Sequence, residues 1–237
     1  GAYPTYLLSL FPNDNLKRSK ANFYDANFKL NHKINNRNNL HLTSYSSNDG
    51  FKFPFDTTYQ YQNQLGTLKW SHIFKNGISA NTSLIVSKYT NSVNGIAPEE
   101  QFALNSSVLN TQAKLDFYQV KEKKTFEYGL GVGTFSINPG SLDIKSSASS
   151  YNPVVLALDL GREAWAYFND EWVFNEKLTL SGGIRVNAFQ KIGPSEAIIY
   201  DNAKPKNLGN IIEIKTFGKN EVEKTYAGIE PRVSLKY

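Results

Sequence analysis

Apolar and polar residues alternate with a period of two, and this feature restricts the fold more than any other. The alternation is clearest in residues 178–190, where every second side chain is apolar or small: Leu178, Leu180, Gly182, Ile184, Val186 and Ala188. Neighbouring residues of a β-strand point to opposite faces, so this segment has one apolar and one polar face. Residues 23–34, 110–119 and 226–237 repeat the pattern. The sequence therefore predicts amphipathic β-strands.

The polar sides of these predicted strands carry charges of both signs. We expect eight charged residues to line an interior that is filled with water or closed by a plug: Asp25, Lys29, Lys114, Asp116, Glu163, Arg185, Glu230 and Arg232. A Lys or Arg that faced lipid at the bilayer centre would cost about 2–4 kcal/mol. The charged sides must therefore face inward, and the apolar sides are predicted to meet lipid.

Short and long connections alternate along the chain. Ten strands are predicted, at residues 5–10, 20–34, 39–47, 65–75, 78–89, 108–119, 125–135, 162–174, 178–190 and 226–237. Tight turns are expected at Asn35–Asn38, Asn76–Gly77, Val120–Lys124 and Asn175–Lys177, and long loops at Pro12–Ser19, Asn48–Gln64, Thr90–Ser107, Ser136–Gly161 and Lys191–Thr225. Every second turn of an up-and-down sheet lies on the same rim, as in outer-membrane barrels. This pattern predicts an all-β, antiparallel up-and-down transmembrane β-barrel, whereas a soluble β-sandwich shares the period but not the alternating connections.

The predicted long loops carry aromatic residues that are candidates for ligand contact: Phe51, Phe53, Phe55, Tyr59, Tyr61 and Tyr151. The alternative interpretation is that these rings only pack against one another within the loops. Another aromatic set falls mostly near the ends of the predicted strands: Trp70, Trp165, Trp172, Tyr24, Tyr89, Tyr128, Tyr167 and Tyr237. These positions are typical of the aromatic girdles of membrane proteins.

Several other functions are disfavoured by the composition. Cysteine and methionine are absent, and no apolar run is long enough for a transmembrane helix. The net charge of +5 is spread along the chain, so nucleic acid is not an expected partner. His32, His41 and His72 lack metal-ligand spacing, and no nucleophile motif indicates an enzyme or a cofactor site. Gly129, Gly131 and Gly133 are interpreted as a place where another element approaches the strand closely, or where the strand bends.

Seven segments together resemble the mid-barrel region of TonB-dependent outer-membrane receptors of Bacteroidota: Asn22–Asn31, Asn38–Tyr45, Leu68–Phe74, Asn81–Leu84, Glu163–Glu171, Gly183–Arg185 and Gly228–Tyr237. The resemblance implies a barrel of about 22 strands around a plug domain. It also implies uptake of a scarce ligand with energy from the TonB complex, with outer-membrane lipid and a surface lipoprotein as further partners.

The whole chain, residues 1–237, is predicted to be one β-barrel segment with about ten strands. We identify no plug domain, TonB box or signal peptide within it. The sequence does not name a ligand. A passive porin or structural outer-membrane barrel is the alternative to a TonB-dependent receptor.

Overall fold

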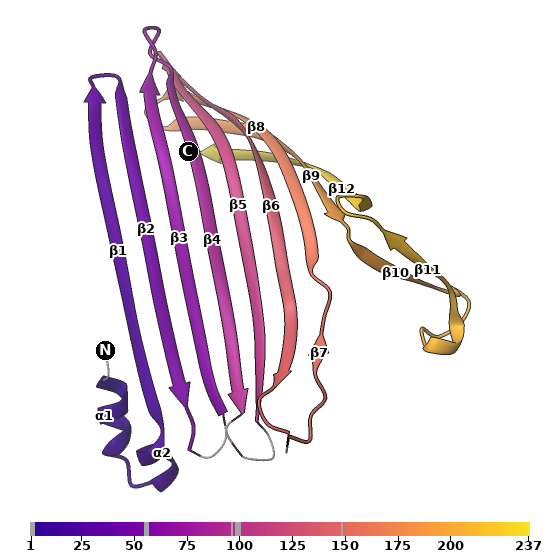
Figure 1. Ribbon diagram of the computed structural model, residues 1–237. Coiled ribbons are helices and arrows are strands. Elements are labelled where there is room, and N and C mark those ends of the chain that lie inside the picture. Colours follow the sequence, from indigo (N-terminus) through magenta and orange to yellow (C-terminus); the bar gives the residue numbers. More distant parts are fainter. Residues whose placement is uncertain (1–2, 55–56, 96, 98–100, 148) are drawn as a thin grey trace.

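The chain forms a single large antiparallel sheet in a computed structural model, which describes residues 3–54, 57–95, 97, 101–147 and 149–237. Nine long strands follow one another in the order of the sequence: β1 (Lys20–Asn35), β2 (Asn38–Lys52), β3 (Thr57–Ile73), β4 (Ser79–Gly95), β5 (Phe102–Lys121), β6 (Lys124–Ile144), β8 (Asp159–Asn175), β9 (Leu178–Ile192) and β12 (Val222–Lys236). The short β7 (Val154–Val155) pairs with β6. The sheet curves strongly, and its outer strands β1 and β12 remain unpaired with each other (Figure 1). The predicted all-β up-and-down architecture is confirmed.

Tight turns join the strands at one rim of the sheet, at residues 36–37, 74–78, 122–123 and 176–177. Asparagine side chains shape three of them. Asn35 Oδ1 accepts a hydrogen bond from the amide of Arg37, Asn76 Oδ1 from that of Ile78, and Asn175 Oδ1 from that of Lys177. Such side-chain acceptors mimic a backbone turn and favour these sites. The predicted short-turn rim is therefore confirmed.

The opposite rim carries connections at residues 53–56, 96–101, 145–158 and 193–221. The first two are much shorter than expected because β2, β3, β4 and β5 extend beyond the predicted strand ends. The last contains a hairpin that the sequence did not predict, made of β10 (Ser195–Tyr200) and β11 (Ile211–Phe217), with the 3-10 turn η2 (Leu208–Asn210) before β11. This hairpin projects away from the sheet (Figure 1).

The strand predicted at residues 5–10 is wrong. The structure has helix α1 (Tyr3–Ser9) there, followed by α2 (Asp14–Arg18). A short apolar run does not distinguish a strand from a helix by periodicity. Thr5 Oγ1 donates a hydrogen bond to the carbonyl of Ala21 and accepts one from its amide. The helix therefore lies against the first residues of β1.

The two faces of the sheet differ in chemistry. Paired residues on neighbouring strands share a face, and one row consists of Asp116, Gly129, Tyr167, Arg185 and Glu230. The adjacent row on the other side consists of Leu115, Leu130, Ala166, Val186 and Ile229. We call these sides the charged face and the apolar face.

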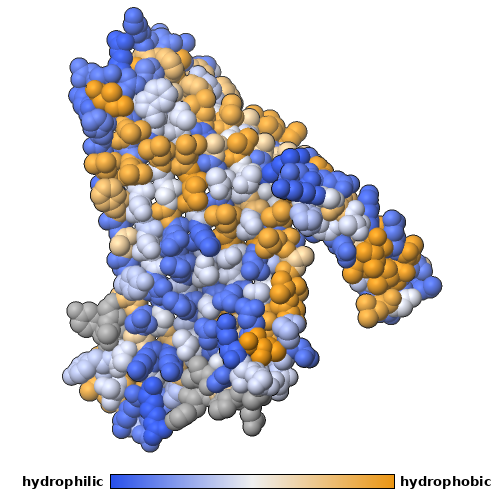
Figure 2. All heavy atoms as spheres, viewed as in Figure 1, coloured by the Kyte–Doolittle hydropathy of each residue, from blue (hydrophilic) through white to orange (hydrophobic). Residues whose placement is uncertain are grey.

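The large side chains of the apolar face are uncovered. Leu84, Leu130 and Ile229 are 53%, 54% and 69% exposed. Among the hydrophobic residues that the structure describes, only Ala80, Ala103 and Phe217 are buried. Hydrophobic residues gather over the part of the sheet nearer the short turns, and the opposite end is mostly polar (Figure 2). This sheet has no dry core of the kind that a soluble sandwich requires.

Candidate functional site

The eight predicted interior residues lie on the charged face. The pairing ladder places Asp116, Arg185 and Glu230 in one row, and a second row runs from Lys29 through Gln112 to Glu163. The others belong to the same face because side chains two or four residues apart on a strand point the same way. These eight residues therefore share one face of the sheet. Their contact with a plug stays a prediction.

Three glycines of β6 allow β5 and β8 to interact across it. A Cβ on Gly131 would overlap the indole of Trp165, and one on Gly129 would lie 2.8 Å from the Tyr167 ring. With this space free, the Tyr167 hydroxyl donates to Asp116 Oδ1 at 2.9 Å. The interpretation of the glycine row as a place of close approach is confirmed, and the approaching groups are side chains of β8.

Further polar contacts extend this network along β5. Gln112 Nε2 donates to Glu163 Oε1 at 3.4 Å, and Lys114 Nζ lies 3.3 Å from Asp116 Oδ2. Asp116 thus forms an ion pair with Lys114 and accepts a hydrogen bond from the Tyr167 hydroxyl. In contrast, no ion pair of Asp25 or Lys29 exists within 4 Å in the described ranges. The structure therefore brings together only part of the predicted interior set.

A cavity of about 210 Å³ opens on the charged face over β8, β9 and β12. Its polar lining comes from Tyr167, Asn169, Arg185, Glu230 and Arg232. Glu230 accepts a 2.6 Å hydrogen bond from Asn187 Nδ2 and lies 3.4 Å from Arg232. The Arg185 guanidinium carbon is 5.5 Å from the Trp165 ring centroid, within the range of a cation–π contact.

The sequence did not single out Trp165, Tyr167, Asn169 or Asn187 as interior residues. The assignment of Trp165 and Tyr167 to an interfacial girdle near the strand ends is wrong, because both lie in the middle of β8, on the charged face. The sequence did contain a signal for this placement. Glu163, Trp165 and Tyr167 are spaced two residues apart, and residues two apart on a strand point to the same face. Tyr89 also shares the charged face, through its pairing with Asn63.

The predicted loop aromatics occupy a different arrangement from the one expected. Phe51 lies in β2, and Tyr59 and Tyr61 lie in β3, so their assignment to a loop is wrong. Phe53 lies in the connection between these strands, and Phe55 lies outside the described residues. Phe51 and Phe53 pack edge to face at 4.4 Å, and Phe53 lies 6.2 Å from Tyr59. These contacts agree with the self-packing alternative, and ligand contact stays a prediction.

Tyr151 is in the connection that follows β6, as predicted, and its ring packs against Phe102 at 5.1 Å. Phe51, Tyr59 and Tyr61 belong to the charged face through their pairing with Ala21 and Asp49. The charged face of the sheet is therefore lined by aromatic rings near its long-connection rim and by charged residues in its middle.

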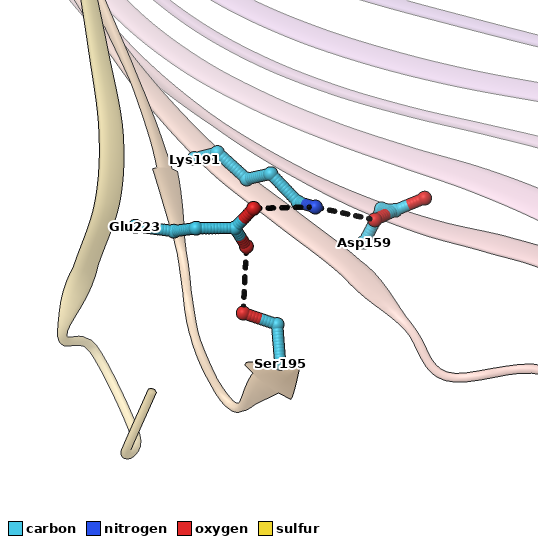
Figure 3. Close-up of polar contacts among 4 residues, drawn as sticks. All are labelled: Asp159, Lys191, Ser195 and Glu223. Carbon is cyan, nitrogen blue, oxygen red and sulfur yellow. Dashed lines mark hydrogen bonds and ion pairs between the residues drawn. The ribbon is translucent and has the colours of Figure 1, made fainter. Parts of the chain in front are cut away.

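A polar cluster holds the base of the β10–β11 hairpin at this rim (Figure 3). Lys191 Nζ lies 3.1 Å from Glu223 and 3.6 Å from Asp159, and the Ser195 hydroxyl donates to Glu223 at 2.7 Å. The hydrogen bond to Glu223 raises the pKa of Lys191 despite partial burial. Burial acts to raise the pKa of Glu223, but the hydrogen bonds from Ser195 and Lys191 outweigh it and lower that pKa.

Within the described part of the chain, no three His, Asp or Glu side chains gather closely enough to hold a metal ion. No described helix is long and apolar enough to cross a membrane.

Comparison with known proteins gives a likeness of fold. No family model and no curated protein sequence matches this chain. The copper transporter OprC superposes with a TM-score of 0.64 at 10% identity, over 91% of this chain and 34% of that one. A double mutant of the Serratia marcescens hemophore receptor HasR, in complex with its hemophore HasA and heme, gives a TM-score of 0.49 at 11% identity, over 92% of this chain and 32% of that one. The chain spans about a third of the length of these structures, and its fold is that of part of the OprC structure.

Proposed function

We propose that this chain forms part of the wall of a TonB-dependent receptor in the bacterial outer membrane, and that the receptor takes up a scarce ligand. The observation that carries the proposal is the division of one uncovered sheet into an apolar and a charged face. Exposed apolar side chains such as Leu84, Leu130 and Ile229 suit contact with lipid. The opposite face suits an aqueous or plugged interior. The fold of OprC supports this assignment.

The length of the strands supports a wall that projects beyond the bilayer. On the apolar face of β3, Trp70 and Leu68 give way to Gln64, Gln62 and Gln60 toward the long-connection rim. On β4, Leu84 and Val86 give way in the same way to Lys88 and then to Thr90. Polar side chains on this part of the apolar face are compatible with water, rather than lipid, outside it. We therefore place this rim outside the cell, where an incoming ligand is met first.

The proposed partners follow from the same assignment. Lipid would contact the apolar face, a plug domain would contact the charged face, and the TonB complex would act through the plug. A surface lipoprotein would meet the long-connection rim. The resemblance of the sequence, rather than the fold, favours an origin in Bacteroidota.

The copper of OprC is not carried over to this chain as a ligand. The chain contains no cysteine or methionine, which are the soft ligands that Cu(I) prefers. No residue of this chain could therefore provide a sulfur ligand. We propose a transport role and no enzymatic activity.

Single-channel recording separates the proposed receptor from a passive porin. The protein as produced by cells would be inserted into a planar lipid bilayer under an applied voltage. A plugged receptor is expected to insert without a steady ion current, because the interior is filled. Stepwise, long-lived conductance in the native state would support the porin alternative and contradict the proposal. Failure to insert into lipid at all would exclude both.

A further inference from the structure

Arg185 makes no ion pair within 4 Å with any residue that the structure describes. In the part of the chain that the structure describes, Lys114 pairs with Asp116 and Arg232 pairs with Glu230, but no carboxylate lies within 4 Å of Arg185. Its Nε atom is shielded from solvent and has no hydrogen-bond partner there. A shielded guanidinium donor without an acceptor is costly, so an external acceptor would be stabilising.

The surroundings of Arg185 hold this side chain in a defined position. Trp165 lies across the backbone of Gly131, and the guanidinium of Arg185 lies over the Trp165 ring. Asn187, the next residue on this face of β9, donates to Glu230 and so engages that carboxylate. The Arg185 side chain, which lines the cavity, is therefore ordered before an anion binds. This order reduces the entropic cost of binding.

The cavity beside Arg185 has the size and charge for a small anionic group. Its volume is about 210 Å³, and its charged lining comprises Arg185, Arg232 and Glu230. Two positive charges against one negative charge leave an excess of one positive charge. Gly183 adds no side chain, and a Cβ at this position would overlap the amide of Asn169. The space and the uncompensated charge occur at the same place.

We propose that this cavity binds a carboxylate group, with Arg185 as its main donor and Arg232 and the Asn169 amide beside it. The planar guanidinium presents two parallel N–H groups that match the two oxygens of a carboxylate. The carboxylate belongs either to a ligand in the interior or to an acidic side chain of a protein segment that fills it. The inference rests on the proposed function, because the charged face must line the interior.

The first test uses Trp165 as a reporter of the site. In a Trp70→Phe/Trp172→Phe background, Trp165 is the only tryptophan of this chain, and every tryptophan elsewhere in the receptor is also replaced by Phe. Succinate would be titrated at constant ionic strength into the protein reconstituted in lipid vesicles, with neutral succinamide as the control. We expect a saturable fluorescence change with succinate alone. Arg185→Gln should weaken binding about 10-fold or more, as for the loss of a charge-assisted hydrogen bond.

Lys114→Gln is the matched control, because Lys114 lies on the same face but already pairs with Asp116. It should leave the succinate affinity within about twofold, since it removes no donor of the cavity.

The second test addresses a carboxylate that a protein segment supplies. Succinate would then cause no fluorescence change, because the site is already filled. Arg185→Gln would instead lower the thermal midpoint of the intact protein more than Lys114→Gln, and Arg185→Lys would restore part of the loss. The inference is overturned if succinate has no effect and the two glutamine variants unfold alike. If the protein also inserts into lipid without channel activity, this outcome would reject the carboxylate site but would not contradict the proposed receptor function.

Discussion

At the scale of single residues, the glycines of β6 set how the charged face is built. Trp165 and Tyr167 lie where side chains of β6 would otherwise stand, and this allows Tyr167 to reach Asp116 on the far strand. The spacing of the glycines was visible in the sequence, and the close approach was predicted from it. The identity of the approaching rings was not, because it depends on the register between β6 and β8.

Gly131→Ala tests this packing. The added methyl group would overlap the Trp165 indole, so the ring must shift, and we expect a loss of about 1–3 kcal/mol in the free energy of unfolding. Urea unfolding in detergent micelles, monitored by tryptophan fluorescence, measures this loss of stability. Gly66→Ala is the control, because nothing lies within 4 Å of a Cβ there. Equal stability of the two variants would contradict the packing described.

At the scale of elements, the sequence predicted the nine long strands of the sheet but not how far they extend. Alternation identifies a strand only where its two faces meet different environments. The run from Gln60 to Gln64 is polar at most positions, so the period of two is lost although β3 continues through it. The hairpin of β10 and β11 was missed in a similar way. Ile198 and Ile199 are adjacent and both exposed, so this strand has no distinct apolar face.

The base of that hairpin is expected to respond to pH. The lowered pKa of Glu223 means that its contribution is present above the usual value of 4.5 and is lost as pH falls through the lowered value. The raised pKa of Lys191 means that its contribution is present below 10.5 and is lost only as pH rises above that. We therefore expect an ordered hairpin base between about pH 5 and 10.

A spin label at Ala197→Cys measures this effect, because the chain has no other cysteine. Its mobility should increase below the usual Glu223 pKa, and Glu223→Gln should make it mobile at every pH. Glu196→Gln is the control and should keep the acid transition. A label that is equally mobile at neutral and acid pH in the unmodified cluster would contradict the role of Glu223.

At the scale of the whole molecule, strand direction limits how the sheet can close. The nine long strands alternate in direction, so β1 and β12 run the same way. They cannot pair with each other antiparallel, and two copies side by side meet the same obstacle. A fully antiparallel barrel therefore needs an odd number of further strands between these edges, in agreement with the predicted barrel of about 22 strands.

Cross-linking tests this closure in the protein as cells produce it. Cysteines at Asn31 and Ser234 place one thiol on each edge strand, on the charged face. We expect no link between them with a short thiol reagent, whereas the paired positions Thr43 and Thr67 should link efficiently. Equal yields for both pairs would show that β1 and β12 meet directly.

The two-faced wall itself is tested most directly by spin labels placed one at a time along residues 184–187 of β9 in lipid vesicles. Collisions with oxygen, which concentrates in lipid, and with a water-soluble nickel chelate report the environment of each label. The labels at Ile184 and Val186 are predicted to favour oxygen, and those at Arg185 and Asn187 should be shielded from it. Equal oxygen exposure at all four positions, or the reverse alternation, would contradict a lipid-facing apolar face.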